Sequence, residues 1–168
     1  MAATPTPRPE LTGATVVITG ASSGLGRGVA LALAASGANV VLAARRADLI
    51  EELAAKIIET GGNSLAVTTD VSREEDVARL AAAAVDRFGQ VDVWVNNVGV
   101  GALGFFWDVP ARDHARIVDV NLKGLVFGAC EALARFRAQG FGTLVNIGSI
   151  DSEMPLAYQA SYAATKAA

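Results

Sequence analysis

The chain has 168 residues, 52% of them hydrophobic and 18% charged, which is long and apolar enough for one globular core and excludes a disordered chain. Its formal net charge of −3 argues against a nucleic-acid partner, and no apolar run approaches the ~20 residues of a membrane helix. A single cysteine and a single histidine argue against an intrachain disulfide and against a metal site.

The first twelve residues contain Pro5, Pro7 and Pro9 and no apolar stretch of the kind found in signal peptides. We therefore expect a loose arm over residues 1–12, followed by one cytoplasmic domain over residues 13–168.

Beyond the arm, short apolar and β-branched runs alternate with helical patterns. The predicted strands cover residues 14–19, 39–44, 64–69, 91–95 and 143–147. The predicted helices cover residues 25–36, 48–60, 72–88 and 113–139, and a further helix carries Tyr162. Glycines follow the first three helices, as expected at helix ends, and Ser72 with Glu75 has the spacing of a capping box.

Strands that are apolar throughout, alternating with helices of this length, indicate a parallel sheet covered on both faces. Right-handed crossovers then favour an α/β fold with a doubly wound, Rossmann-like parallel sheet.

Two isolated residues have ordinary structural interpretations. Cys130 lies in an apolar helical stretch, which predicts a small core residue. His114 lies among Arg112, Asp113 and Arg116, which predicts a solvated surface histidine.

A glycine-rich turn connects the first predicted strand to the first helix. Residues 19–26 read Thr-Gly-Ala-Ser-Ser-Gly-Leu-Gly. Glycines there let backbone N–H groups approach a pyrophosphate, which the helix N-terminus also attracts. The alternative is that a tight strand-to-helix turn requires glycine for its own conformation. The position in the first βα unit favours the nucleotide interpretation.

Tyr162 and Lys166 are separated by four residues and therefore share one face of a helix. An ammonium group near a phenol favours the phenolate, which suits a general acid/base. Ser149, whose hydroxyl both donates and accepts, precedes this pair. The alternatives are a packed tyrosine, a solvated lysine and a serine that caps a helix.

Taken together, the first turn, Tyr162 and Lys166 resemble the short-chain dehydrogenase/reductase family, in the subgroup with a Thr-Gly-x-x-x-Gly-x-Gly turn and Tyr-x-x-x-Lys. The resemblance runs from about residue 11 to residue 168. Its further motifs fall in order after the predicted strands and on the long helix: Asp70-Val71, Asn96-Asn97-Val98-Gly99, Asn121 and Ser149. Val98 departs from the usual alanine, and we expect it to be tolerated.

The resemblance implies an oxidoreductase that interconverts a hydroxyl and a carbonyl group by hydride transfer. It implies that Tyr162 is the general acid/base and that Lys166 favours its phenolate and binds the nicotinamide ribose. It also implies that Ser149 holds the substrate oxygen and that Asn121 anchors a water in a proton relay.

The same resemblance implies a set of cofactor-binding residues. Asp70 and Val71 are expected beside the adenine, and Asn97 and Gly99 on the adenosine ribose side. The full set is Gly20, Ser22, Ser23, Gly24, Leu25, Gly26, Arg45, Asp70, Val71, Asn97, Gly99, Tyr162 and Lys166.

The end of the second strand bears on which nicotinamide cofactor is used. An acidic residue there binds the 2′-hydroxyl of NAD, but this chain has Ala44, followed by Arg45 and Arg46. Because arginine pairs with phosphate, NADP is favoured over NAD, and the resemblance supports Arg45 and Ser22 as the phosphate contacts. The alternative is that both arginines only flank a helix start.

The substrate is less constrained. Residues 100–108 include Phe105, Phe106 and Trp107, and the segment after Ser149 adds Met154 and Leu156. An apolar alcohol or ketone is compatible with such walls.

Members of the resembled family continue well beyond the catalytic lysine. We therefore expect the chain to be a fragment that lacks the last strand or strands and helices, the full-length parent being a homo-oligomer. The alternative is a truncated, non-catalytic nucleotide-binding module. The spacing of the first turn disfavours an epimerase or dehydratase.

Overall fold

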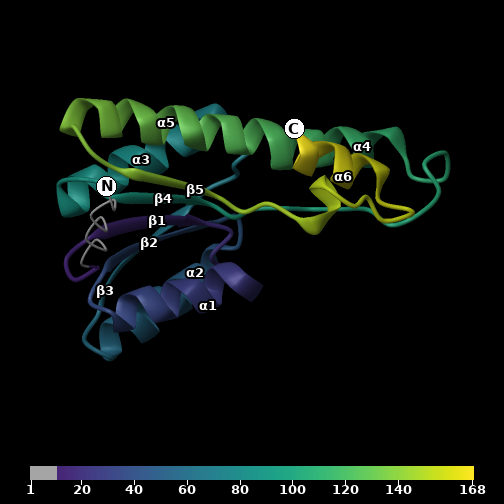
Figure 1. The fold of residues 1–168 in the computed structure, drawn as a ribbon. Helices are drawn as coiled ribbons and strands as arrows, with labels where there is room; N and C mark the ends of the chain where they lie inside the picture. Colours follow the sequence, from purple (N-terminus) through teal and green to yellow (C-terminus); the bar gives the residue numbers. More distant parts are fainter. Residues whose placement is uncertain (1–10) are drawn as a thin grey trace, which may run out of the picture.

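The computed structural model describes residues 11–168, so the arm predicted for residues 1–12 lies almost wholly outside the described residues. Strands and helices alternate along the chain (Figure 1). The elements are β1 (Thr15–Thr19), α1 (Gly24–Ala35), β2 (Asn39–Ala44), α2 (Ala47–Glu59), β3 (Asn63–Thr68), α3 (Glu74–Phe88), β4 (Val93–Asn96), α4 (Ala111–Val118), η1 (Asp119–Lys123), α5 (Gly124–Gln139), β5 (Thr143–Asn146), η2 (Ile150–Ser152) and α6 (Ala160–Ala167).

The five strands form one sheet in the order β3-β2-β1-β4-β5, and every pairing is parallel. The chain therefore builds outward from β1 in one direction to β3 and then returns to the other side of β1 for β4 and β5. This arrangement confirms the predicted doubly wound α/β fold. The order reverses between β1 and β4, the place where open α/β sheets bind ligands at the carboxyl ends of their strands.

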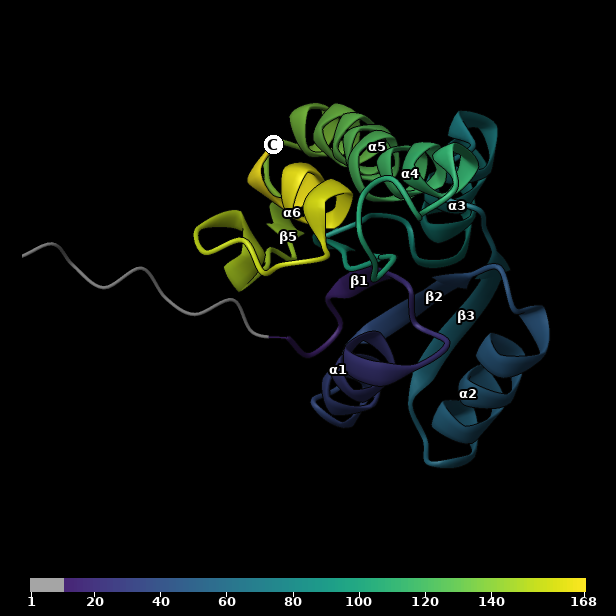
Figure 2. The same cartoon turned by 90° about the vertical axis from the view of Figure 1, so that its right-hand side faces the viewer.

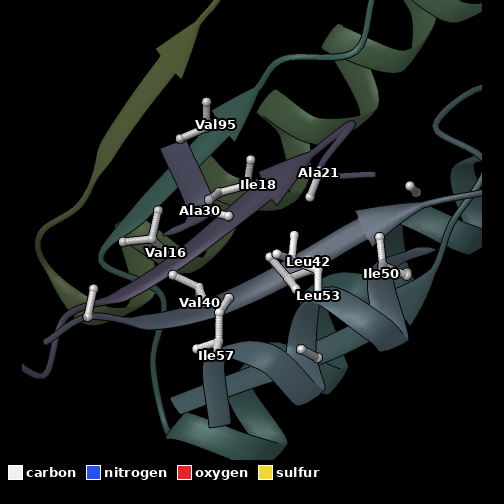
Figure 3. Packing of buried hydrophobic residues seen from close by; sticks show 13 residues of the cluster. Val16, Ile18, Ala21, Ala30, Val40, Leu42, Ile50, Leu53, Ile57 and Val95 are labelled. Atoms are coloured by element: carbon white, nitrogen blue, oxygen red, sulfur yellow. The ribbon is translucent and has the colours of Figure 1, made fainter. Parts of the chain in front are cut away.

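Helices cover both faces of the sheet. In Figures 1 and 2, α1 and α2 lie on one face, and α3, α4 and α5 lie on the other. Side chains alternate between the faces, as a strand requires. Val16 and Ile18 of β1 belong to the apolar cluster that includes residues of α1 and α2 (Figure 3), whereas Val17 belongs to the cluster of α3 and α5. Both clusters are apolar and buried, which is why the strands read as continuous hydrophobic runs.

The start of α3 differs from the prediction. The N-cap residue of α3 is Arg73, with no side-chain cap. The hydroxyl of Ser72 instead donates to Oδ1 of Asp70, at 2.7 Å. The capping-box prediction is therefore wrong, because an ionised carboxylate two residues away competes with the helix for the serine. The predicted helix end is confirmed, since Gly89 has a φ of 84°.

The long helix predicted over residues 113–139 begins two residues earlier and contains a π-helical turn. Residues Asp119–Lys123 form η1, which separates α4 from α5 and contains the buried Asn121. Single π turns inside α-helices occur frequently at functional sites.

Cys130 is exposed, so its prediction as a core residue is wrong. The buried positions of α5 are Gly124, Gly128, Ala132 and Phe136, a stripe at four-residue intervals. Cys130 lies off this stripe, and the apolar composition of α5 concealed which of its faces meets the sheet.

His114 is half-buried and bonded within the protein, so its prediction as a solvated histidine is wrong. Its ring nitrogens contact the Phe106 carbonyl oxygen, eight residues away, and the hydroxyl of Ser161, 47 residues away, and the residues adjacent to His114 indicate neither contact. Among residues 11–168, no helix has the length and hydropathy that would let it cross a membrane.

Candidate active site

A cleft of about 370 Å³ opens at the carboxyl ends of β1, β2, β3 and β4. Every predicted cofactor-binding residue lines it except Gly24, Tyr162 and Lys166. It is also lined by six residues that were not predicted as site residues, namely Ala44, Arg46, Thr69, Val98, Val100 and Val120. The cleft thus joins four strand-end segments that are far apart in the sequence, together with Val120 of η1.

The glycine-rich turn is held against the end of β4. The Asn97 side-chain amide donates to the Thr19 carbonyl oxygen at 2.9 Å, and the Asn97 backbone N–H donates to Thr19 Oγ1 at 3.0 Å. A Cβ atom on Gly26 would lie 2.5 Å from the Gly20 carbonyl oxygen and 2.6 Å from Asn97 Nδ2. Gly26 is therefore required by packing inside the protein, and this close packing brings the start of α1 to the cleft.

A guanidinium group bridges the first turn and the end of β2. Nη2 of Arg46 donates to the hydroxyl oxygens of Ser22 at 2.9 Å and Ser23 at 3.0 Å. Arg45 lines the same cleft, and Ala44 is 8% exposed beside it. The sequence analysis selected Arg45 and Ser22 for a phosphate. The adjacent arginines at positions 45 and 46 and the adjacent serines at positions 22 and 23 were the sequence signals that could have identified Arg46 as a further cleft residue.

Asp70 supplies a carboxylate to the cleft lining, and this carboxylate accepts two hydrogen bonds from Ser72. Oδ1 of Asp70 accepts from the Ser72 backbone N–H at 3.1 Å as well as from its hydroxyl. Burial acts to raise the pKa of Asp70, but the two bonds from Ser72 and the charges of Arg45 and Arg116 outweigh it and hold that pKa below its ordinary value. Asp70 is therefore an acceptor that stays ionised.

Tyr162 and Lys166 lie on α6, as the i, i+4 spacing predicted. The ammonium Nζ of Lys166 lies 5.9 Å from the centre of the Tyr162 ring and donates to the Ile147 carbonyl oxygen at 2.7 Å. Burial lowers the pKa of Lys166 below its ordinary value. The lysine is thus fixed to the end of β5 and lies close to the tyrosine ring.

The segment after β4 joins this pair to the cleft. A Cβ atom on Gly99 would lie 3.8 Å from Lys166 Nζ, and one on Gly101 would lie 3.5 Å from Tyr162 Cδ2. Because Gly99 also lines the cleft, α6 lies directly beside the cleft wall at this residue.

Asn121 is 3% exposed and holds α6 against the same segment. Its amide accepts from the Val100 N–H at 2.8 Å and donates to the Val100 oxygen at 2.9 Å and to Thr165 Oγ1 at 3.0 Å. Both amide hydrogens are therefore used inside the protein. One lone pair of its oxygen stays available for a further donor such as water.

Ser149 follows β5 and caps the short helix η2. Its Oγ accepts from the Asp151 N–H at 3.2 Å, which is the capping role weighed as the alternative for this residue. That bond uses one lone pair and leaves the hydroxyl hydrogen available to a ligand. The capping role and a role in substrate binding are therefore compatible.

The family model described as short chain dehydrogenase matches residues 14–168. The uncharacterized oxidoreductase YxnA of Bacillus subtilis (strain 168) is 40% identical over 90% of this chain, and the chain covers 43% of that protein. A short-chain dehydrogenase/reductase from Burkholderia phymatum, solved in complex with NAD, superposes on this chain with a TM-score of 0.91 at 34% identity. The superposition covers 94% of this chain and 57% of the Burkholderia chain.

An alcohol dehydrogenase from the archaeon Thermococcus sibiricus, solved with 5-hydroxy-NADP, superposes with a TM-score of 0.86 at 31% identity. The superposition covers 91% of this chain and 65% of the Thermococcus chain. The chain thus spans roughly half to two thirds of the length of these three proteins.

Proposed function

The chain belongs to the short-chain dehydrogenase/reductase family, and on this premise we propose that it is an NADP-dependent oxidoreductase that interconverts a hydroxyl and a carbonyl group. The observation that carries the proposal is that Gly99, which lines the cleft, lies against Lys166 of α6, while Gly101, two residues further on, lies against Tyr162.

The cleft fits a dinucleotide. The turn between β1 and α1 places backbone N–H groups and a helix N-terminus at its wall, where a pyrophosphate would be held. When bound, the nicotinamide ring supplies or accepts the hydride, and the protein supplies orientation and a proton.

The preference for NADP rests on the end of β2. Ala44 leaves no carboxylate that would repel a 2′-phosphate at this position, and Arg45 and Arg46 both line the cleft. Because Arg46 already bonds the hydroxyls of Ser22 and Ser23, a phosphate there would meet an assembled set of donors. We assign the phosphate contacts to Arg45, Ser22 and Arg46.

We assign the proton chemistry to four residues, Tyr162, Lys166, Ser149 and Asn121. In the reducing direction the Tyr162 hydroxyl gives its proton to the substrate oxygen, and in the oxidising direction the phenolate takes that proton back. The Lys166 ammonium favours the phenolate. The Ser149 hydroxyl donates to the substrate oxygen, and the free lone pair of Asn121 Oδ1 holds a water of the proton relay.

The substrate we propose is a small apolar alcohol or ketone. Large hydrophobic side chains are exposed in the two segments that flank Ser149 and Tyr162, at residues 101–110 and 150–159. They are Leu103, Phe105, Phe106, Trp107, Ile150, Met154, Leu156 and Tyr158. A polar substrate would gain nothing from these side chains, whereas an apolar one would cover them.

Self-association through α4 and α5 is part of the proposal, as the resemblance implies. Val118, Val126 and Leu133 are exposed apolar residues along these helices. A sedimentation measurement that shows a dimer or tetramer supports this assembly, and a monomer at all concentrations contradicts it.

The test of the proposed function is calorimetric binding of NADPH and NADH to the purified chain, together with its Arg45→Asp variant. We expect saturable binding of NADPH, weaker binding of NADH, and loss of NADPH binding in the variant. Arg112→Asp makes the same change of charge at a highly exposed residue that does not line the cleft, and it should bind as the wild type does. Equal binding of both cofactors, unaffected by Arg45→Asp, would contradict the NADP assignment.

A further inference from the structure

His114, the only histidine of the chain, contacts two segments that flank the candidate active site. Its Nδ1 atom lies 2.6 Å from Ser161 Oγ, and its Nε2 atom lies 3.0 Å from the Phe106 carbonyl oxygen. The Phe106 ring stacks on the imidazole with a centroid distance of 4.3 Å and an interplanar angle of 25°. Three contacts from one side chain thus join α4, the segment after β4, and α6.

The partners define how the imidazole is protonated when it is neutral. A carbonyl oxygen only accepts, so Nε2 carries the hydrogen that is donated to Phe106. Nδ1 is then an acceptor, and the Ser161 hydroxyl donates to it. Both ring nitrogens are used, so the orientation of the ring is fixed by its hydrogen bonds and by the stacked Phe106.

Each partner of His114 adjoins a different part of the proposed site. Phe106 belongs to the aromatic segment, which we define as residues 103–107. Ser161 lies in the first turn of α6, directly before Tyr162. Figures 1 and 2 show α4 beside α6, which brings His114 to Ser161.

The aromatic segment has a second attachment on the same side. The Gly104 N–H donates to the Tyr158 carbonyl oxygen at 3.1 Å, and the Phe105 ring meets the Tyr158 ring edge-on at 5.1 Å. Phe105 also stacks on Trp107 at 5.0 Å. Tyr158 has a φ of 69°, a strained conformation for a residue other than glycine. The aromatic segment is therefore attached at both Tyr158 and His114.

Little else restrains these rings. Phe106 is 59% exposed and Trp107 is 78% exposed, so they lack the burial that normally orders an apolar side chain. Helix α6 is held by contacts with other elements, among them the bond of Asn121 to Thr165 Oγ1 and the bond of Lys166 Nζ to the Ile147 carbonyl oxygen. The bond between His114 and Phe106 therefore supplies order to the exposed rings, and the bond between His114 and Ser161 adds a further restraint at the start of α6.

We propose that His114 is a positioning residue that holds the aromatic segment at a set distance from Tyr162, so that an apolar substrate bound against these rings presents its oxygen to the tyrosine. The catalytic part of this inference rests on the proposed function. The restraint that His114 places on the aromatic segment and on α6, which we call the clamp, does not. His114 touches neither the cleft lining nor the reacting atoms; it acts through Phe106 and Ser161.

The first test is hydrogen exchange, which needs no activity. His114→Phe keeps an aromatic ring against Phe106 and removes both hydrogen bonds. We expect amides of residues 101–110 and of Ala160–Ala167 to exchange about tenfold faster, since two hydrogen bonds are lost, while β1 and β2 exchange as before. His114→Gln, which keeps one donor and one acceptor, should exchange more slowly than His114→Phe. Unchanged exchange in His114→Phe would overturn the clamp.

The second test is steady-state kinetics with NADPH, comparing 1-phenyl-2-propanone with acetone. In His114→Phe we expect kcat/KM for the aryl ketone to fall about tenfold, chiefly through kcat because the bound ketone is misplaced relative to Tyr162, and both constants for acetone to change less than about twofold. An equal loss for both ketones would reject the positioning role. A wild type that reduces neither ketone but shows the expected exchange would reject the proposed substrate and leave the clamp supported.

Ser161→Ala removes the hydrogen bond at Nδ1 alone and completes a double-mutant cycle. If the two residues act together, the effects of His114→Phe and Ser161→Ala on exchange at residues 101–110 will be less than additive. Additive effects would show that Ser161 and His114 order the segment independently, which contradicts the clamp.

Discussion

The two sides of the sheet differ in how they are covered and in how they build their part of the site. All residues of β1 are buried, as are all of β2 except its first, whereas β5 has no fully buried residue. The side with β1, β2 and β3 makes its part of the cleft from a single turn and two strand ends. The side with β4 and β5 makes its part from four segments that meet only in the folded protein. We call the side with β1, β2 and β3 the closed side and the side with β4 and β5 the open side. The closed side carries the part of the site that depends mainly on one local turn, and the open side carries the part that is assembled from distant segments.

The largest effect that separates the two sides is expected at Tyr162. Tyr162→Phe removes the proton donor and leaves the nucleotide turn untouched. We expect turnover with NADPH and a ketone to fall by roughly 10²- to 10⁴-fold, the usual contribution of a general acid/base. NADPH binding should be unchanged in calorimetry. A variant that keeps its turnover would remove Tyr162 from the mechanism and leave the open side without its proposed chemistry.

On the closed side, Gly26→Ala should act through packing. A Cβ atom there meets the Gly20 carbonyl oxygen at 2.5 Å, so the turn must shift. We expect a loss of about 1–3 kcal/mol in the free energy of unfolding, and NADPH binding weakened at least about tenfold.

The matched control is Gly28→Ala, two residues further along α1. A Cβ atom on Gly28 meets nothing within 4 Å. Because alanine is the better helix former, this variant should be stabilised by up to about 1 kcal/mol. If both variants lost NADPH binding alike, the local packing account of the turn would be refuted.

A pair of valine variants compares the two sides directly. Val40 of β2 is 0% exposed, and Val145 of β5 is partly buried against the same apolar cluster. Denaturant unfolding should show a loss of about 2 kcal/mol for Val40→Ala, and less than about 1 kcal/mol for Val145→Ala, because a cavity forms only where the surroundings are closed. Equal losses would mean that β5 is as well packed as β2.

The smallest effect concerns acid stability at Asp70. Because the pKa of Asp70 is lowered in the folded state, its contribution to stability is present above the ordinary pKa and is lost as the pH falls through the folded value. Ser72→Ala removes one bond to the carboxylate, so the folded pKa should rise toward its ordinary value. Thermal unfolding followed from about pH 7 to pH 2 should then show a smaller loss with acid, on a slightly less stable protein. An unchanged acid profile would show that Ser72 does not stabilise the carboxylate.

Local rules predicted most of the elements. The first and last residues predicted for the strand over residues 39–44 are those of β2, and the end of α3 at Gly89 was predicted correctly. These features depend on alternation, on helical period and on the conformational freedom of glycine, all of which involve near neighbours. The candidate residues of the nucleotide cleft came from the family resemblance, and most of them meet in the structure because motifs directly after strands lie at one edge of a parallel sheet.

The predictions that were wrong depend on which contacts a side chain makes in the folded protein, and residue type and spacing alone do not decide those contacts. Cys130 was predicted in the core, His114 in solvent, and Ser72 at a helix cap. Cys130 lies off the face of α5 that meets the sheet. His114 bonds Ser161 in another segment, and Ser72 bonds the carboxylate of Asp70.

What the sequence by itself determined is therefore the order of strands and helices, the glycine turn and the identity of the residues at strand ends, because short-range sterics and periodicity specify them. Only the tertiary structure decided that Asn121 bonds Thr165, 44 residues away, that Asn97 holds the turn at Thr19, 78 residues away, and that His114 bonds Ser161, 47 residues away. Such contacts form when the chain closes on itself, and their geometry depends on the packing of whole helices and strands.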